Sequence, residues 1–252
     1  MIPNLDIAKK IKIHGEINVP GEFSISKNTS LSQIVEKAGG YSSNAYPIGG
    51  ILLRRSVRDA EIMIKEKSYN EIIKFISSSK DLGSISSNPE GLSSFLSLMT
   101  SVKPSGRLVT EFDLDKISLD PKLDTMLQDG DEIFIPPYIN QVYVFGEVMT
   151  PSARPYLEGG TAMDYIKLAG GLSRLADKSR IIVISPNGDA MTNGNPFSRI
   201  LNSSNQLILP GTYIYVPLQI GRLEGLDLAS SVAPLVSSLA LSLASLNSIS
   251  NN

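Results

Sequence analysis

Apolar residues recur at helical spacing near the end of the chain, where the polar positions between them are serines instead of charges. Residues 228–252 contain no Asp, Glu, Lys or Arg, although charged residues make up 19% of the sequence. At about 100° per residue, this pattern predicts one helix with three faces. The first face is apolar, the second consists of alanines and the third of serines.

Each face of this predicted helix has its own set of residues. The apolar face comprises Leu228, Val232, Leu235, Val236, Leu239, Leu243 and Leu246. The alanine face comprises Ala229, Ala233, Ala240 and Ala244. The serine face comprises Ser230, Ser237, Ser238 and Ser245. A helix over residues 228–246 would be about 30 Å long, which matches the hydrocarbon thickness of a bilayer.

The three faces together favour a bundle of membrane helices over a solitary one. Hydroxyls that face lipid have no hydrogen-bond partner, so a single spanning helix with many serines is unfavourable. In a ring of copies, the leucines would face lipid, the alanines would let neighbouring backbones approach, and the serines would line a wet pore. Pro234 and Leu241 fit this picture less well, and an amphipathic helix docked on its own domain or on a partner remains an alternative.

Upstream of this tail, the chain contains one module twice. Residues 13–20 read IHGEINVP and residues 144–151 read VFGEVMTP, an offset of 131 that also relates the Ala-Gly-Gly of residues 38–40 and 169–171. A second landmark, DGDEIFIP at 129–136, recurs as PGTYIYVP at 210–217 with an offset of 81. The first copy therefore carries about fifty extra residues between the two landmarks.

The hydrophobic pattern of each copy predicts a small mixed sheet that holds one short helix. An alternating strand near residues 11–13 or 142–144 leads into a second extended piece that ends near Phe23 or Tyr156. A helix follows at residues 31–38 or 162–169, opened by Thr29 or Ser30 in the first copy and by Thr161 in the second. The Gly-Gly pair ends it, with the first glycine in the left-handed conformation.

The rest of each copy reads as buried strand. Residues 51–53 and 181–184 form apolar runs, and the second run leads into a turn at residues 186–189. The closing strand ends at a proline, which predicts a position at the edge of the sheet. In the first copy, the extra residues predict two helices, over 67–79 and 89–102.

These elements give an α+β organisation with four parts. Residues 1–10 lead into module 1 at 11–137, which has a helical insertion at about 61–105. Module 2 follows at 138–218, and residues 219–252 form a linker and the C-terminal amphipathic membrane helix.

Composition and charge narrow the function classes. The chain has 23 basic and 25 acidic residues and a net charge of −2, which gives no electrostatic footprint for nucleic acid. It has no cysteine, which excludes disulfides and thiolate chemistry. The start shows no basic stretch followed by an apolar run, so no signal peptide is predicted, and an exported protein would then begin within a longer chain.

No catalytic constellation stands out, so the sequence predicts neither an enzyme nor a cofactor or metal site. His14 corresponds to Phe145 in the other copy, which favours a packing role at a strand end. No phosphate-binding loop, nucleophile elbow or zinc-binding pair is present. Two charged clusters are interpreted as solvated, a turn and a strand end respectively: Asp129, Asp131 and Glu132, and Arg54, Arg55 and Arg58.

The repeated motif resembles the SLBB domain, a β-grasp-like module. Its structural positions are Gly15, Pro20, Gly39 and Gly40 in the first copy, and Gly146, Pro151, Gly170 and Gly171 in the second. Two such modules followed by an amphipathic helix resemble the outer-membrane polysaccharide export proteins, the capsule and exopolysaccharide translocons of Gram-negative bacteria. Members of this family usually begin with a polysaccharide-export domain, and some carry an N-terminal lipidated cysteine. This sequence shows neither, so the resemblance implies the C-terminal part of a longer protein or a divergent form.

The resemblance implies a ring, often eightfold, of SLBB modules in the periplasm with an α-helical barrel through the outer membrane. The expected partners are a polysaccharide, further copies of the chain, outer-membrane lipid and the inner-membrane polysaccharide co-polymerase machinery, with no nucleic acid. The expected function is a passive conduit for capsular or exopolysaccharide. Two alternatives stay open: a soluble periplasmic scaffold whose terminal helix docks on a partner, and a ligand-binding SLBB protein.

Overall fold

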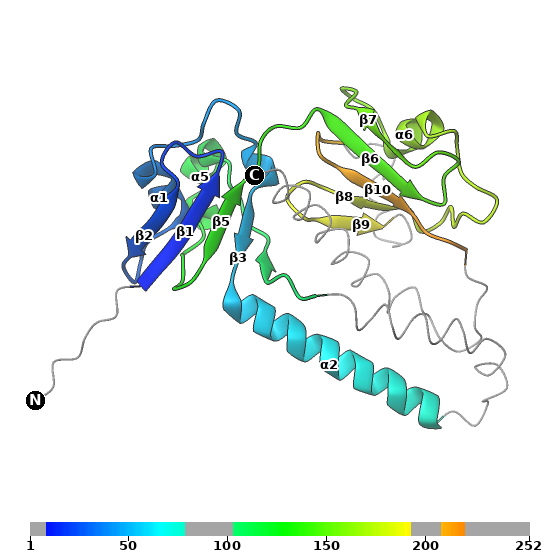
Figure 1. Ribbon diagram of the computed structural model, residues 1–252, viewed down its shortest axis with the longest axis horizontal. Helices are drawn as coiled ribbons and strands as arrows, with labels where there is room; N and C mark the ends of the chain where they lie inside the picture. Colours follow the sequence, from blue (N-terminus) through cyan, green and yellow to red (C-terminus); the bar gives the residue numbers. More distant parts are fainter. Residues whose placement is uncertain (1–8, 79–102, 193–207, 220–252) are drawn as a thin grey trace, which may run out of the picture.

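The computed structural model describes residues 9–78, 103–192 and 208–219, which form two units that lie side by side (Figure 1). The first unit contains strands β1 (Lys9–Gly15), β2 (Gly21–Ile25), β3 (Ile51–Leu53), β4 (Arg107–Leu108) and β5 (Glu132–Ile135). Its helices are α1 (Leu31–Lys37), α2 (Arg55–Ser78) and α5 (Leu114–Leu119), with 3₁₀ turns η1 (Pro47–Gly49) and η2 (Pro121–Leu123).

The second unit repeats this plan without the long insertion. Its strands are β6 (Gln141–Gly146), β7 (Ser152–Pro155), β8 (Ile182–Ile184), β9 (Ala190–Thr192) and β10 (Tyr213–Val216), and its helix is α6 (Ala162–Leu168). The strand orders, β2-β1-β5-β3-β4 and β7-β6-β10-β8-β9, are the same. The predicted α+β class and the duplication are therefore confirmed.

The closing strand of each unit lies at the centre of its sheet, so the predicted edge position was wrong. β5 pairs in parallel with β1, where Ile13 lies opposite Ile133, and antiparallel with β3. β10 makes the equivalent pairs with β6 and β8. The proline is compatible with a central strand because it follows the last paired residue: Pro136 comes directly after Ile135 and uses only its carbonyl, which accepts the backbone N–H of Tyr46 at 2.8 Å.

The short helices α1 and α6 lie where the apolar spacing predicted them. Ser30 opens α1, and its backbone N–H donates to the Gln33 side chain at 3.1 Å. Thr161 opens α6, where its backbone N–H donates to Asp164 at 3.1 Å and its hydroxyl accepts the Asp164 backbone N–H at 3.3 Å. These reciprocal bonds satisfy donors that the first turn of a helix leaves free.

Each unit has its own apolar core between helix and sheet. In the first unit, the buried residues include Ile11, Ile13, Leu31, Ile34, Val35, Leu52, Ile133 and Ile135. In the second unit, they include Val142, Val144, Tyr165, Ile166, Ile181, Val183, Ile214 and Val216. Both lists combine alternate strand positions with one stripe of a short helix, which is the periodicity that the sequence shows.

The helix of the insertion begins at residue 55, well before the predicted start at residue 67. It leaves directly after β3 and runs away from both sheets (Figure 1). Most of its described side chains are exposed, so its first half carries little apolar periodicity. α5 and η2 were not predicted, and the predicted helix over residues 89–102 lies outside the described residues.

Candidate functional site

The Gly-Glu turn ends the parallel strand pair of each unit in a position that only glycine fits. Gly15 has φ +86°, and a Cβ there would lie 2.1 Å from the carbonyl oxygen of Ile135. Gly146 has φ +87°, and its Cβ would lie 2.2 Å from the carbonyl oxygen of Val216. Both a left-handed backbone and a close strand approach therefore require glycine.

The glutamate of the same turn joins it to the segment after the helix. The backbone N–H of Glu147 donates to Val216 at 2.8 Å, and its carboxylate accepts the hydroxyl of Ser173 at 2.6 Å. Glu16 makes the same bonds to Ile135 and to the Ser42 hydroxyl. A carboxylate that holds a hydroxyl and a backbone turn in place indicates a structural role.

The Gly-Gly pair lies against this turn. Both glycines of each pair, not only the first, have a left-handed backbone, with φ between +80° and +88°. The carbonyl of Gly40 accepts the backbone N–H of Asn18 at 3.0 Å, and that of Gly171 accepts the N–H of Met149 at 3.0 Å. Pro20 and Pro151 are exposed and directly precede β2 and β7.

Arg54 and Asp131 form a buried ion pair, which the sequence interpretation missed. The guanidinium donates to both carboxylate oxygens, at 3.0 Å from Nε and 2.7 Å from Nη2, and the side chain of Asp131 is fully buried. Asp131 also accepts the backbone N–H of Gln128 at 2.8 Å. The interpretation of these two residues as a solvated turn and a solvated strand end was therefore wrong.

The second unit has uncharged residues at the two positions that correspond to this ion pair. Thr212 is the counterpart of Asp131, and its hydroxyl accepts the backbone N–H of Leu209 at 3.2 Å, as Asp131 accepts that of Gln128. Ser185 stands where the first unit has Arg54. Both partners change together between the copies, which is the signal that could have identified the pair.

At the junction of the two units, the buried Tyr46 of the first unit meets Tyr138 of the segment that joins the units. Tyr46 packs edge to face against Tyr138, with ring centroids 5.5 Å apart. The backbone N–H of Tyr138 donates to the carbonyl of Asn44 at 2.9 Å. Burial, followed by the nearby Tyr138 and Tyr156 hydroxyls, raises the pKa of Tyr46, so its phenol stays neutral at physiological pH.

Arg107 connects the two units directly. It lies on the edge strand β4, is 8% exposed, and donates from Nη2 to Pro186 of the second unit at 2.8 Å and to Gly50 at 3.4 Å. Burial lowers the pKa of Arg107 to about 10, and Asp189 opposes this shift. The guanidinium therefore remains charged at neutral pH and acts as an anchor between the units.

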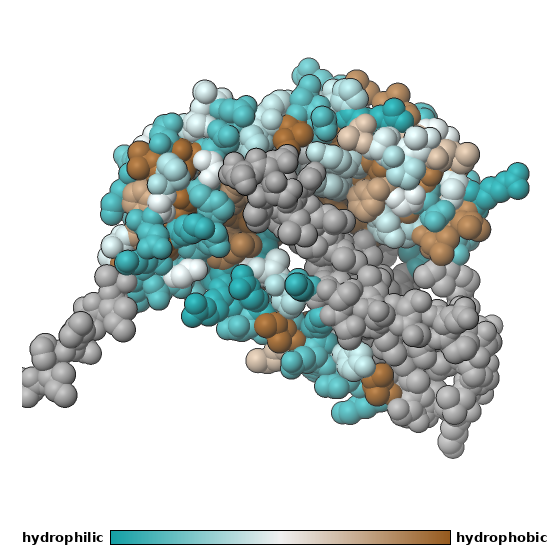
Figure 2. All heavy atoms as spheres, in the orientation of Figure 1, coloured by the Kyte–Doolittle hydropathy of each residue, from teal (hydrophilic) through white to brown (hydrophobic). Residues whose placement is uncertain are grey.

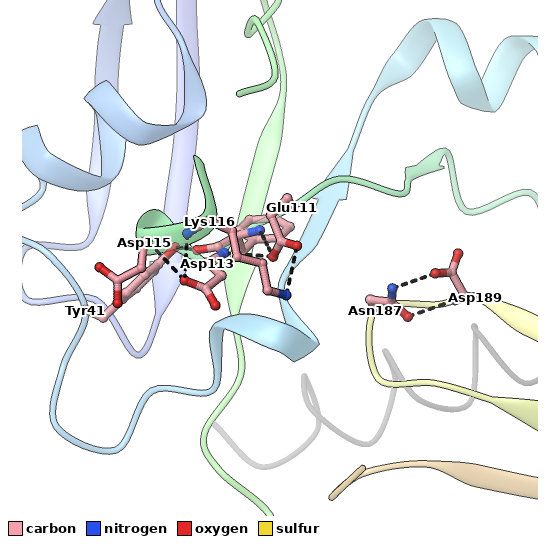
Figure 3. A network of polar contacts seen from close by, with 8 residues as sticks. Tyr41, Glu111, Asp113, Asp115, Lys116, Asn187 and Asp189 are labelled. Atoms are coloured by element: carbon pink, nitrogen blue, oxygen red, sulfur yellow. Dashed lines mark hydrogen bonds and ion pairs between the residues drawn. The ribbon is translucent and has the colours of Figure 1, made fainter. Parts of the chain in front are cut away.

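Polar contacts around the start of α5 hold local structure (Figure 3). The Tyr41 hydroxyl donates to the carbonyl of Phe112 at 2.6 Å, and Lys116 lies 3.2 Å from Glu111. Asp113 caps α5 by accepting the backbone N–H of Asp115 at 3.0 Å. These bonds fix a turn and a helix start, and they place no activated nucleophile beside a base.

His14 packs against neighbouring side chains of β5. Its Nε2 lies 3.1 Å from Glu132 and its ring lies against Phe134, with centroids 5.1 Å apart. Partial burial lowers the pKa of His14, although Glu132 opposes this. Within residues 9–78, 103–192 and 208–219, no three His, Asp or Glu side chains gather as a metal site would require.

The residues predicted to face lipid, to contact neighbouring helices and to line a pore, at 228–246, lie outside the described residues. Across the described ranges, no helix combines the length and the apolar character that crossing a bilayer requires. What the structure does bring together are the eight module positions, which lie beside the Gly-Glu turn at one end of each unit.

Parts of both units are similar to known proteins. The SLBB domain model matches residues 10–63 and 141–194, so it covers the first strands and the short helix of each unit. Over 120 residues, the chain is 33% identical to the polysialic acid transport protein KpsD of Escherichia coli. The matched part covers 47% of this chain and 20% of that relative, so the chain spans about a fifth of the length of the curated protein it matches.

Proposed function

We propose that this chain is a subunit of an outer-membrane channel for polysaccharide export, because part of each unit matches the SLBB domain model and the chain is similar to a polysialic acid transport protein. The observation that carries this proposal is the position of the uncharged tail. Residues 228–252 follow the second unit after a short linker, and their sequence pattern predicts a helix with the three faces that a pore would need.

The proposed mechanism is passive conduction through a ring of identical subunits. The SLBB units would stack as a collar in the periplasm of a Gram-negative bacterium, and the terminal helices would form an α-helical pore. Serine hydroxyls in the lumen can donate to and accept from sugar hydroxyls without a fixed charge that would trap the chain. Many weak contacts favour passage of a long polymer, which an inner-membrane export machinery would supply.

The structure supports a conduit more than catalysis. The buried ion pair, the Glu–Ser contacts and the network near α5 each hold backbone segments together. A subunit that only guides a polymer needs rigid modules and a pore, and the described residues provide the modules.

A charge on the apolar face of the tail tests the proposal. Leu239→Asp is expected to cost about 2–4 kcal/mol per subunit, because it places a carboxylate among acyl chains, and so to abolish membrane insertion and export. The matched control is Ser238→Asp, which adds the same charge one residue away on the serine face and should spare insertion. Sedimentation with carbonate-washed membranes measures insertion. Equal insertion of both variants would favour a tail docked on protein.

A further inference from the structure

The chain leaves both units through the same arrangement of loops, which we call the exit end. In the first unit, Tyr138 donates its backbone N–H to Asn44 at 2.9 Å, next to a bridge between Ala45 and Pro137. In the second unit, Gln219 donates to Leu175 at 2.6 Å, next to a bridge between Ala176 and Leu218. Each exit end lies at the carboxyl end of the parallel pair, β1 with β5 or β6 with β10.

The two exit ends differ in what covers them. That of the first unit is the junction, where Tyr46 is 9% exposed and packs edge to face against Tyr138 of the connecting segment. That of the second unit points away from the first (Figure 1), and apolar atoms reach the surface on this side of the second unit (Figure 2). It exposes three apolar side chains: Met149 at 66%, Leu175 at 61% and Leu218 at 45%. Their counterparts in the first unit are Asn18, Asn44 and Pro137.

The charges around this apolar end are also specific to the second unit. Arg174 and Lys178 are exposed on either side of Leu175, whereas Ser43 and Pro47 occupy these positions in the first unit. The acid between them, Asp177, is 7% exposed and is paired with Arg180 at 3.0 Å. Within the loop 174–178, the exposed charged side chains are therefore both basic, and they flank the exposed Leu175 in the sequence.

We propose that the exit end of the second unit rests on a membrane surface, with Met149, Leu175 and Leu218 among the lipid headgroups and with Arg174 and Lys178 at anionic phosphates. This inference depends on the proposed channel, because the tail must place the unit near lipid. Only eight residues lie between Gln219 and Leu228, a span of at most about 30 Å even when fully extended. Apolar side chains bordered by basic ones are the composition that binds the interface of anionic bilayers.

Single-cysteine labelling tests this contact, because the full chain has no cysteine of its own. Leu175→Cys, Leu119→Cys and Leu239→Cys would each carry a fluorophore, in full chain reconstituted into vesicles of phosphatidylethanolamine and phosphatidylglycerol. A fraction of the lipids would carry a quencher at the headgroup or in the acyl chain. Leu119 is the matched control, since it lies on the first unit and is 86% exposed.

The expected result is headgroup quenching at residue 175, acyl-chain quenching at residue 239 and none at residue 119. Quenching at 239 without quenching at 175 would overturn the contact and leave the channel standing. A lack of quenching at 239 would overturn the channel and, with it, this inference. A fluorophore at 175 that is shielded from water but not quenched by lipid would show a protein contact and also overturn the proposal.

Charge reversal tests the phosphate part separately. Arg174→Glu with Lys178→Glu is expected to weaken association of the exit end with these vesicles by about five-fold per residue, because each basic side chain near an anionic surface contributes to this extent. The measure is the extent of headgroup quenching at residue 175 with increasing phosphatidylglycerol. A response identical to that of the parent L175C chain would contradict the assignment of Arg174 and Lys178.

Discussion

Replacing Gly146 by alanine is expected to lower the free energy of unfolding of the second unit by about 3 kcal/mol or more. Two costs add. The left-handed backbone, φ +87°, costs an L-residue about 1–2 kcal/mol. The added methyl would also lie 2.2 Å from the Val216 carbonyl oxygen, and relief of such overpacking costs about 1–3 kcal/mol. Denaturant unfolding followed by tyrosine fluorescence measures the loss.

The matched control for this change is Gly171→Ala. Gly171 has φ +88°, and a Cβ there would meet nothing within 4 Å. It therefore carries the backbone cost alone, about 1–2 kcal/mol. Equal losses in the two variants would show that the close approach of the strands does not constrain the turn.

Asp131→Ala is expected to destabilise the first unit by about 3–5 kcal/mol, the usual cost of removing one partner of a buried ion pair. The Arg54 side chain is 11% exposed and would keep its charge without a carboxylate. The backbone N–H of Gln128 would lose its acceptor at 2.8 Å as well. The midpoint of urea unfolding measures this effect.

The second unit supplies the compensating control. Asp131→Thr combined with Arg54→Ser recreates the pair Thr212 and Ser185, in which a hydroxyl accepts the backbone N–H and no charge is buried. This double variant should recover most of the stability that Asp131→Ala loses. A double variant no more stable than Asp131→Ala would show that the charge pair itself is required, and would contradict the interpretation of the two units as alternative solutions.

Because the module occurs twice, much of the fold could be predicted from this single sequence. Two copies of the Gly-Glu turn and the Gly-Gly pair fixed where the strands and the short helix begin and end, because each glycine position is set by backbone geometry. Apolar alternation near Ile13 and Val144 then identified the buried face of the strands.

Other features depend on tertiary contacts, which the hydrophobic pattern of the sequence does not reveal. The position of β5 and β10 at the centre of the sheet follows from parallel pairing between segments more than one hundred residues apart in the first unit. Asp131 can be buried because Arg54, directly after β3, pairs with its carboxylate. The sequence around either residue alone does not indicate burial. The early start of α2 was missed because an exposed helix needs no apolar stripe.

For the tail, in contrast to these structural features, the proposed role comes entirely from the sequence. Residues 228–252 lack any charge that would favour water. On a helical projection, the serine face lies apart from the apolar face, with Leu241 as an exception. The second unit ends at residue 219, and eight residues separate it from the start of this stretch in the sequence.

The most direct measurement of the central claim is the environment of two adjacent residues of the tail. Ser238→Cys and Leu239→Cys, each in the reconstituted full chain, would be treated with a membrane-impermeant thiol reagent. A pore with serines inside predicts rapid modification at residue 238 and protection at residue 239. Equal reactivity at both positions, or protection of residue 238 together with exposure of residue 239, would contradict it.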